Sequence, residues 1–196
     1  MLQKTIVYVS RVTNLSDARY CAGMGVDWLG YVVDPSHTDY VSPVQYQSMV
    51  GWISGPGRVV EITAEGLDLP AILADYAPDV IHLSLELINQ YNLPDLPLII
   101  QAGMDDWPGT MSRIQSLDRK VLYVVLSGAM KETELSGLQL DGSVKVLLSL
   151  ESDLGPLARL VQKTKAGGFA LRGSKEIAPG LKDYDHLAQV LEELQG

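Results

Sequence analysis

Short apolar runs of strand length alternate with amphipathic stretches along the whole chain. The apolar runs are rich in Val, Ile and Leu, which is typical of parallel strands that helices cover on the outside. Eight strands are predicted, at Thr5–Ser10, Trp28–Val33, Arg58–Thr63, Val80–Leu85, Leu96–Gln101, Lys120–Ser127, Val144–Leu150 and Gly168–Gly173. The clearest predicted helices are Leu15–Met24, Pro43–Ile53, Leu69–Tyr76, Thr110–Leu117, Gly155–Lys165 and Asp183–Leu194.

Local signals support these boundaries. Asn14 is a good N-cap for the first helix, and Ser42 precedes a proline at the first position of the second. The stretches Leu87–Tyr91 and Glu132–Leu138, after the fourth and sixth strands, are weaker helix formers, and we expect short or irregular helices there.

Eight strand and helix units in 196 residues leave about 25 residues for each unit, near the lower limit of the (β/α)8 barrel. We therefore predict an α/β fold: one TIM barrel domain that spans residues 1–196. A doubly wound open sheet is the alternative. The first strand is followed by no Gly-x-Gly-x-x-Gly turn, which counts modestly against a dinucleotide-binding sheet.

The composition is that of a folded protein, with 46 % hydrophobic and 20 % charged residues. A net charge of −9 disfavours nucleic acids and anionic membranes, because both repel an acidic surface. The single cysteine, Cys21, cannot form an internal disulfide, and no zinc-type spacing is present. No signal peptide or membrane-spanning run is apparent. We expect a soluble cytoplasmic monomer or homodimer that needs no cofactor or metal.

Distinctive motifs lie near both ends of the chain. Near the start these are the segment Val12–Ala18 (VTNLSDA), Ala22, Gly25-Val26-Asp27, Leu29-Gly30-Tyr31 and Tyr40–Pro43 (YVSP). Near the end they are Glu176, Pro179-Gly180 and Lys182-Asp183. Together these motifs resemble the phosphoribosylanthranilate isomerase family, and they match about a third of the chain in detail, in the family's order and spacing. The resemblance implies a TIM barrel and a cofactor-free Amadori rearrangement in tryptophan biosynthesis.

The resemblance fails at the residues that catalyse this reaction. The family's base is a cysteine at the end of the first strand, where this chain has Ser10, and a hydroxyl is a far weaker acid than a thiol. The family's acid is an aspartate at the end of the sixth strand, but Lys120–Ser127 contains no carboxylate. An arginine that holds the anthranilate group is replaced by Asp39, which reverses the charge. Loss of each acid-base group typically costs about 10²–10⁴-fold in rate, so we expect a protein without that isomerase activity.

The family's phosphate site is retained in part. Its members place glycine-rich turns after the last two strands, where backbone N–H groups hold the phosphate. The eighth strand ends in Arg172, Gly173, Ser174 and Lys175, which keeps small residues and adds cations. The seventh ends in Ser149 and then Glu151, an acid where glycines are expected. We expect weak binding of a phosphorylated small molecule.

The carboxyl ends of the strands bring further polar residues to one mouth, where barrel enzymes place their sites. Arg11, Asp34 and His37 are the further candidates. The loop between Asp34 and Asp39, which holds His37, is rich in Asp, Pro, Ser, His and Thr, and a loop of this composition is more often a plain surface turn. The other residues expected at the mouth are Thr63, Glu86, Asp105, Asp106 and Ser127. His82 falls inside the fourth strand, where a hydrogen-bonded core histidine is the favoured interpretation.

Three hypotheses remain from the sequence. The first is a degenerate relative of the isomerase that retains the barrel and some affinity for a phosphorylated ligand. The second is an enzyme with another sugar-phosphate or isomerase chemistry, which predicts a polar mouth that holds a carboxylate of raised pKa. The third is a scaffold or regulatory protein, which predicts an exposed apolar patch on the outer helices together with no pocket large enough for a ligand.

Overall fold

The computed structural model describes residues 4–103, 105, 107–128, 140, 143–149, 164–173, 176–178, 181–182 and 185–195. Within these ranges, eight parallel strands form a closed barrel in chain order, β1 to β8. They are β1 (Ile6–Ser10), β2 (Trp28–Val32), β3 (Gly57–Glu61), β4 (Val80–Ser84), β5 (Leu98–Ala102), β6 (Val121–Leu126), β7 (Lys145–Ser149) and β8 (Gly168–Arg172). The predicted TIM barrel is confirmed.

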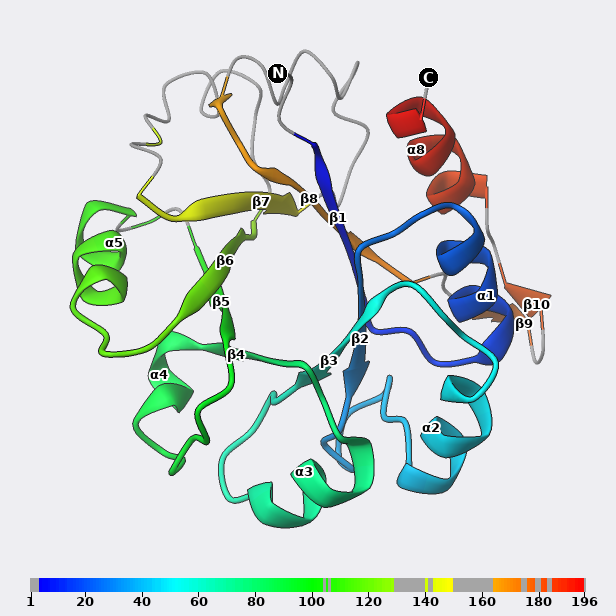
Figure 1. Cartoon of the computed structure of the whole chain (residues 1–196), viewed down its shortest axis with the longest axis horizontal. Helices are drawn as coiled ribbons and strands as arrows, with labels where there is room; N and C mark the ends of the chain where they lie inside the picture. Colours follow the sequence, from blue (N-terminus) through cyan, green and yellow to red (C-terminus); the bar gives the residue numbers. More distant parts are fainter. Residues whose placement is uncertain are drawn as a thin grey trace.

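Helices lie on the outside of this ring (Figure 1). They are α1 (Leu15–Gly23), α2 (Pro43–Val50), α3 (Leu69–Tyr76), α4 (Leu85–Ile88), α5 (Trp107–Gln115) and α8 (Asp185–Gln195). The bounds of α3 match the prediction from the sequence. The helix after β4 is short, as expected, but begins two residues before the predicted stretch at Leu87. Two predicted helical segments cannot be compared with the structure. All of Glu132–Leu138 lies outside the described residues, as does Gly155–Lys165 up to residue 163.

Side-chain caps fix where the first helices begin. The Asn14 side chain accepts a hydrogen bond from the Asp17 N–H at 2.9 Å. Ser42 caps α2 through the Gln45 N–H at 3.3 Å, with Pro43 in the first turn. Each cap satisfies an N–H that the helix itself leaves free. Both N-caps predicted from the sequence are confirmed.

Two buried clusters separate the inside of the barrel from its outside. One lies between strands and helices and includes Val9, Leu29 and Ile81. The other lines the barrel interior with Tyr8, Val59, Val80, Ile99, Tyr123, Val125, Leu147 and Ala170. Side chains alternate between the two faces of a strand. The residue two positions beyond an interior residue therefore also points inward, and this rule identifies the side chains at the mouth.

Closure of the barrel depends on β1 and β8, the first and last strands. They pair in register from Ile6 with Gly168 to Ser10 with Arg172. Gly168 permits this approach, because a Cβ there would overlap the backbone of Ile6. After β8, Glu176–Ala178 (β9) and Leu181–Lys182 (β10) form a small antiparallel pair that the sequence pattern does not predict. No helix among the described residues is long and apolar enough to cross a membrane.

Candidate functional site at the carboxyl ends of the strands

The mouth of the barrel gathers inward-pointing side chains from most of its strands. Alternation from the interior cluster places hydroxyl groups at the ends of β1, β4, β6 and β7, and a guanidinium at the end of β8. These residues are Ser10, Ser84, Ser127, Ser149 and Arg172. Glu61 and Gln101 point inward from β3 and β5 by the same rule. The described mouth is thus polar and rich in hydroxyl groups.

Ser10 and Ser127 stand where the isomerase resemblance places the base and the end of the acid-bearing strand. The Ser10 hydroxyl donates to the Leu171 carbonyl oxygen at 3.0 Å. The Ser127 hydroxyl donates to the Ala102 carbonyl oxygen at 3.2 Å. Neither of these hydrogen bonds joins the hydroxyl to a base that could remove its proton, which an oxygen nucleophile or base requires. Both hydroxyls bind the backbone of a neighbouring strand.

Asp39, in the segment between β2 and α2, contacts two arginines. Its Oδ2 atom lies 2.7 Å from Nη2 of Arg172. The same oxygen lies 3.7 Å from Nη1 of Arg11. Three separate candidates from the sequence are therefore brought together, and the guanidinium of Arg172 binds a carboxylate of its own chain.

Asp34 and His37 organise the turn that carries Asp39. Oδ1 of Asp34 accepts hydrogen bonds from the hydroxyl and backbone N–H of Ser36, and Oδ2 accepts one from the Thr63 hydroxyl. The hydrogen bond from the Ser36 side chain is the largest influence that lowers the pKa of Asp34. Nδ1 of His37 accepts from the Asp39 N–H at 3.0 Å. The contacts described for Asp34 and His37 thus shape the turn.

The predicted phosphate-binding residues are described only in part. Arg172 is exposed and Ser149 is half-buried, both at the mouth. The Gly173 N–H donates to the Ser10 carbonyl oxygen at 2.7 Å, so it joins β8 to β1. Ser174 and Lys175 lie outside the residues whose side chains are described, as does Glu151.

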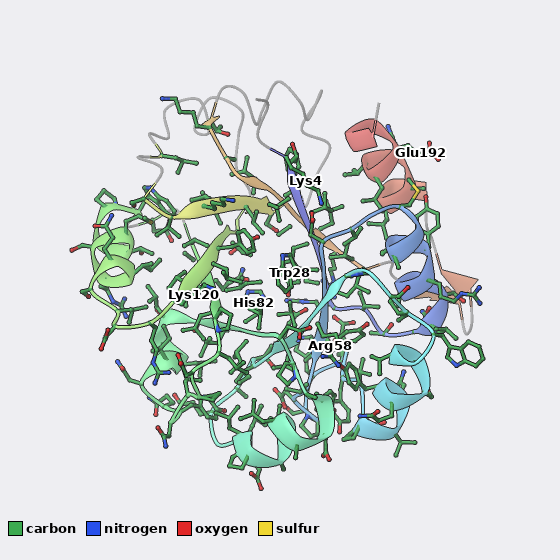
Figure 2. The ribbon with its side chains drawn as sticks, in the orientation of Figure 1. Lys4, Trp28, Arg58, His82, Lys120 and Glu192 are labelled. Atoms are coloured by element: carbon green, nitrogen blue, oxygen red, sulfur yellow. The ribbon has the colours of Figure 1, made fainter. Side chains whose placement is uncertain are left out.

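A buried polar network lies directly below the mouth, and His82 is the one side chain in it that was identified from the sequence. Glu61 and His82 are both buried, with 4 % and 7 % of their surface exposed. Oε1 of Glu61 accepts the Arg11 N–H at 2.7 Å. The Tyr8 hydroxyl is a hydrogen-bond partner of Glu61 and also lies 2.9 Å from Nδ1 of His82. His82 lies within the ring of strands (Figure 2), with Nε2 3.1 Å from Oε1 of Gln101.

Burial governs the protonation of this network, because a charged group loses its hydration inside the barrel. Burial raises the pKa of the Glu61 carboxyl, although the hydrogen bond from the Arg11 N–H opposes the shift. Burial lowers the pKa of His82 to about 4. It also raises the pKa of Tyr8 well above its ordinary value. His82 and Tyr8 are therefore neutral at pH 7.

The hydrogen-bond partners indicate the direction of the network. Nε2 of His82 faces an amide oxygen, which cannot donate, so Nε2 carries the hydrogen and Nδ1 accepts from Tyr8. The single hydrogen of the Tyr8 hydroxyl then has two neighbouring acceptors, Nδ1 of His82 and the Glu61 carboxyl. The hydrogen bond with Tyr8 lowers the pKa of Glu61, so it opposes the burial that raises this pKa.

Gly30 on β2 makes room for the network. A Cβ at this position would overlap Oε1 of Glu61 and the hydroxyl of Tyr8. Glu61 was not identified from the sequence. The signal that could have revealed it is a single acid in the apolar run Val59–Ile62, on the same face of the strand as Val59. Among the described residues, no group of three or more His, Cys, Asp or Glu side chains could hold a metal ion.

Solved structures with this architecture cover nearly the whole chain. A phosphoribosylanthranilate isomerase from Thermotoga maritima superposes with a TM-score of 0.72 at 18 % identity, over 98 % of this chain and 99 % of the other. An isomerase in complex with reduced 1-(o-carboxyphenylamino)-1-deoxyribulose 5-phosphate superposes with a TM-score of 0.72 at 19 % identity. The match covers 98 % of this chain and 99 % of the isomerase.

The fold is that of the phosphoribosylanthranilate isomerases. An isomerase from Pyrococcus furiosus has the same fold at only 10 % identity, with a TM-score of 0.70 over 97 % of this chain and 98 % of its own. No family model and no curated protein sequence matches the chain. The resemblance inferred from the sequence is thus confirmed in the isomerase fold, at identities too low to transfer activity.

Proposed function

We propose that this protein is a divergent cytoplasmic relative of the phosphoribosylanthranilate isomerases, that residues 1–196 form one barrel domain, and that it lacks their activity. The observation that carries the proposal is the environment of Ser10. Its hydroxyl donates to a backbone carbonyl at 3.0 Å. The Amadori rearrangement needs a base that removes a proton from the sugar carbon and an acid that opens the ring. A neutral hydroxyl bound in this way supplies neither.

The Asp39 side chain supports the same proposal. The resemblance implies that the isomerases have an arginine at this position, which holds the anthranilate group. This chain has a carboxylate there instead, 2.7 Å from Arg172. An anionic substrate would meet a like charge at the point where the isomerases attract it. Substrate orientation and proton transfer are thus both impaired.

Complementation tests the loss of activity. A tryptophan auxotroph that lacks the isomerase is transformed with this gene, and the Thermotoga maritima isomerase in the same vector is the positive control. We expect no growth without tryptophan at protein levels that match the control. Growth at the control's rate rejects the proposal.

The retained function is weak binding of a phosphorylated small molecule at the ends of β7 and β8. Arg172 is the described cation there, and Ser149 is the described hydroxyl beside it. Isothermal titration with ribose 5-phosphate tests this site, with ribose as the uncharged control. We expect binding of the phosphate ester alone, and its loss in Arg172→Gln. Equal heats for the ester and ribose reject the site.

One observation favours a second candidate, an enzyme that transfers protons on a sugar phosphate. The second hypothesis predicted a mouth carboxylate of raised pKa, and the pKa of Glu61 is raised by burial beneath a polar mouth. In D2O, such an enzyme would exchange the hydrogen beside the carbonyl of ribulose 5-phosphate, and the loss of its proton NMR signal measures this. Exchange by the wild type but not by Glu61→Gln supports this candidate, whereas equal rates in both reject it.

A further inference from the structure

Two arginines from neighbouring strands share one carboxylate oxygen at the mouth. Arg172 ends β8 and Arg11 follows β1, and the two strands pair in register up to Ser10 and Arg172. Oδ2 of Asp39 lies 2.7 Å from Arg172 and 3.7 Å from Arg11. We call Arg11 and Arg172 the arginine pair. Two guanidinium groups facing one oxygen form a receptor for an oxyanion.

The barrel itself holds the backbone of the arginine pair. Arg11 has a φ of 56°, in the left-handed region that costs a non-glycine residue about 1–3 kcal/mol of strain. Its N–H is bound by buried Glu61 at 2.7 Å. The Gly173 N–H fastens the end of β8 to the Ser10 carbonyl oxygen. Strain of this kind persists where the surroundings impose it, so these bonds fix the points from which both side chains extend.

Asp39, in contrast, lies on a turn. Its N–H donates to Nδ1 of His37, and the His37 N–H donates to the Asp34 carbonyl oxygen at 3.0 Å. The turn rejoins the barrel where the Val41 N–H donates to the Val32 carbonyl oxygen. The carboxylate can therefore leave the arginine pair through a change confined to the segment between Val33 and Val41.

The charge and the exposure of these side chains favour replacement of the Asp39 carboxylate by an external anion. The side chains of Arg11 and Arg172 are 36 % and 45 % exposed, and that of Asp39 is 23 % exposed. Ion pairs with this much exposure are weak. Two cations and one anion leave a net positive charge on these three residues. Asp34, on the turn that carries Asp39, has its carboxylate bound to Ser36 and Thr63. Glu61 also interacts electrostatically with Arg11 and Asp39, and burial raises the pKa of its carboxyl.

We propose that Arg11 and Arg172 form an oxyanion-binding site that Asp39 occupies in the absence of ligand, and that an external carboxylate or phosphate binds by displacing Asp39. Asp39 is then an internal competitor that restricts the site to ligands able to replace it. This inference rests on the proposed function in so far as Arg172 belongs to the proposed phosphate site.

Isothermal titration of the full chain with inorganic phosphate, and separately with malonate, tests the site at low ionic strength. We expect Asp39→Asn to bind the preferred anion about five- to tenfold more tightly than the wild type, because the competing ion pairs are lost. Arg11→Gln in the Asp39→Asn background removes the gain. The two arms distinguish a phosphate from a carboxylate ligand.

Asp79→Asn is the matched control. Asp79 also pairs with an arginine, Arg58, at 3.2 Å, but immediately before β4, at the opposite end of the barrel. Both substitutions remove one negative charge, so an equal gain in both variants indicates a general charge effect and overturns the proposal. Unchanged affinity in Asp39→Asn also overturns it.

Ribose 5-phosphate separates this inference from the proposed function. If the ester binds the wild type and Asp39→Asn equally, the proposed ligand stands and internal competition is wrong. If Asp39→Asn gains affinity for inorganic phosphate or malonate while the ester fails to bind the wild type, the competition stands and the proposed ligand is wrong. If no anion binds either protein, both fail.

Discussion

The carboxyl of Glu61 is expected to make the stability of the barrel depend on pH. Its folded-state pKa lies above the ordinary value, with burial as the main cause. In the pH range between the two values, the folded state binds more protons than the unfolded state. Stability is then highest below the ordinary glutamate pKa of about 4.3 and falls as pH rises through the folded pKa.

Glu61→Gln removes the loss of stability at higher pH, because an amide does not ionise, and it keeps the size and hydrogen-bonding shape of the side chain. The amide oxygen can accept from the Arg11 N–H, which Glu61 accepts at 2.7 Å in the wild type, and the amide N–H₂ can donate to the Tyr8 oxygen. Below the ordinary pKa of Glu61 we expect equal free energies of unfolding. At higher pH the variant gains about 1.4 kcal/mol for each unit by which folding raises the pKa of Glu61. Glu61→Leu instead leaves the Arg11 N–H without its acceptor and costs about 1–3 kcal/mol.

Urea unfolding at pH 4 and at pH 8 measures these free energies. The exposed Glu65 supplies the control, because Glu65→Gln removes a carboxylate that is not buried. A Glu61→Gln variant that is less stable than the wild type at pH 8, or equally shifted at both pH values, refutes the reasoning. It would mean that the carboxylate form of Glu61 is the one that stabilises the barrel.

Three further substitutions have defined outcomes. Gly30→Ala should lower the free energy of unfolding by about 1–3 kcal/mol, measured in urea, because its Cβ overlaps Glu61 and Tyr8. Asn14→Ala should cost about 1 kcal/mol in the same measurement, through loss of the α1 cap; no change would contradict the capping role. Ser10→Cys alone should not rescue the tryptophan auxotroph, since it supplies a base without an acid; growth would show that a thiol suffices.

Much of the fold could be predicted because its signals are local. Apolar runs rich in branched residues indicated the eight buried strands, and Asn14 and Ser42 marked helix starts through hydrogen bonds that span three residues. The β9–β10 pair could not be predicted in this way, since its strands have three and two residues and show no period. The start of α4 was misplaced because Ser84 ends a strand and precedes the helix directly.

The site was harder to predict because its contacts join residues far apart in the sequence. Asp39 was identified through the resemblance, as the replacement of an arginine, and Arg172 as the end of the eighth strand, but their 2.7 Å contact joins residues 133 positions apart. Glu61 was missed, since one acid in a strand gives no sign of the partners that β1 and β4 supply. Whether the Glu61 side chain points into the barrel depends on which face of β3 lines the interior. The alternation of side chains decides this only once the barrel is known to close.

The most direct test of the central claim is turnover of phosphoribosylanthranilate by the purified protein, followed through the loss of substrate fluorescence. The Thermotoga maritima isomerase serves as the positive control. With a hydroxyl in place of the base and no carboxylate on β6, we predict no conversion above the uncatalysed rate. Conversion at an enzyme-like rate would contradict the claim that this barrel has lost the proton transfers of the isomerase reaction.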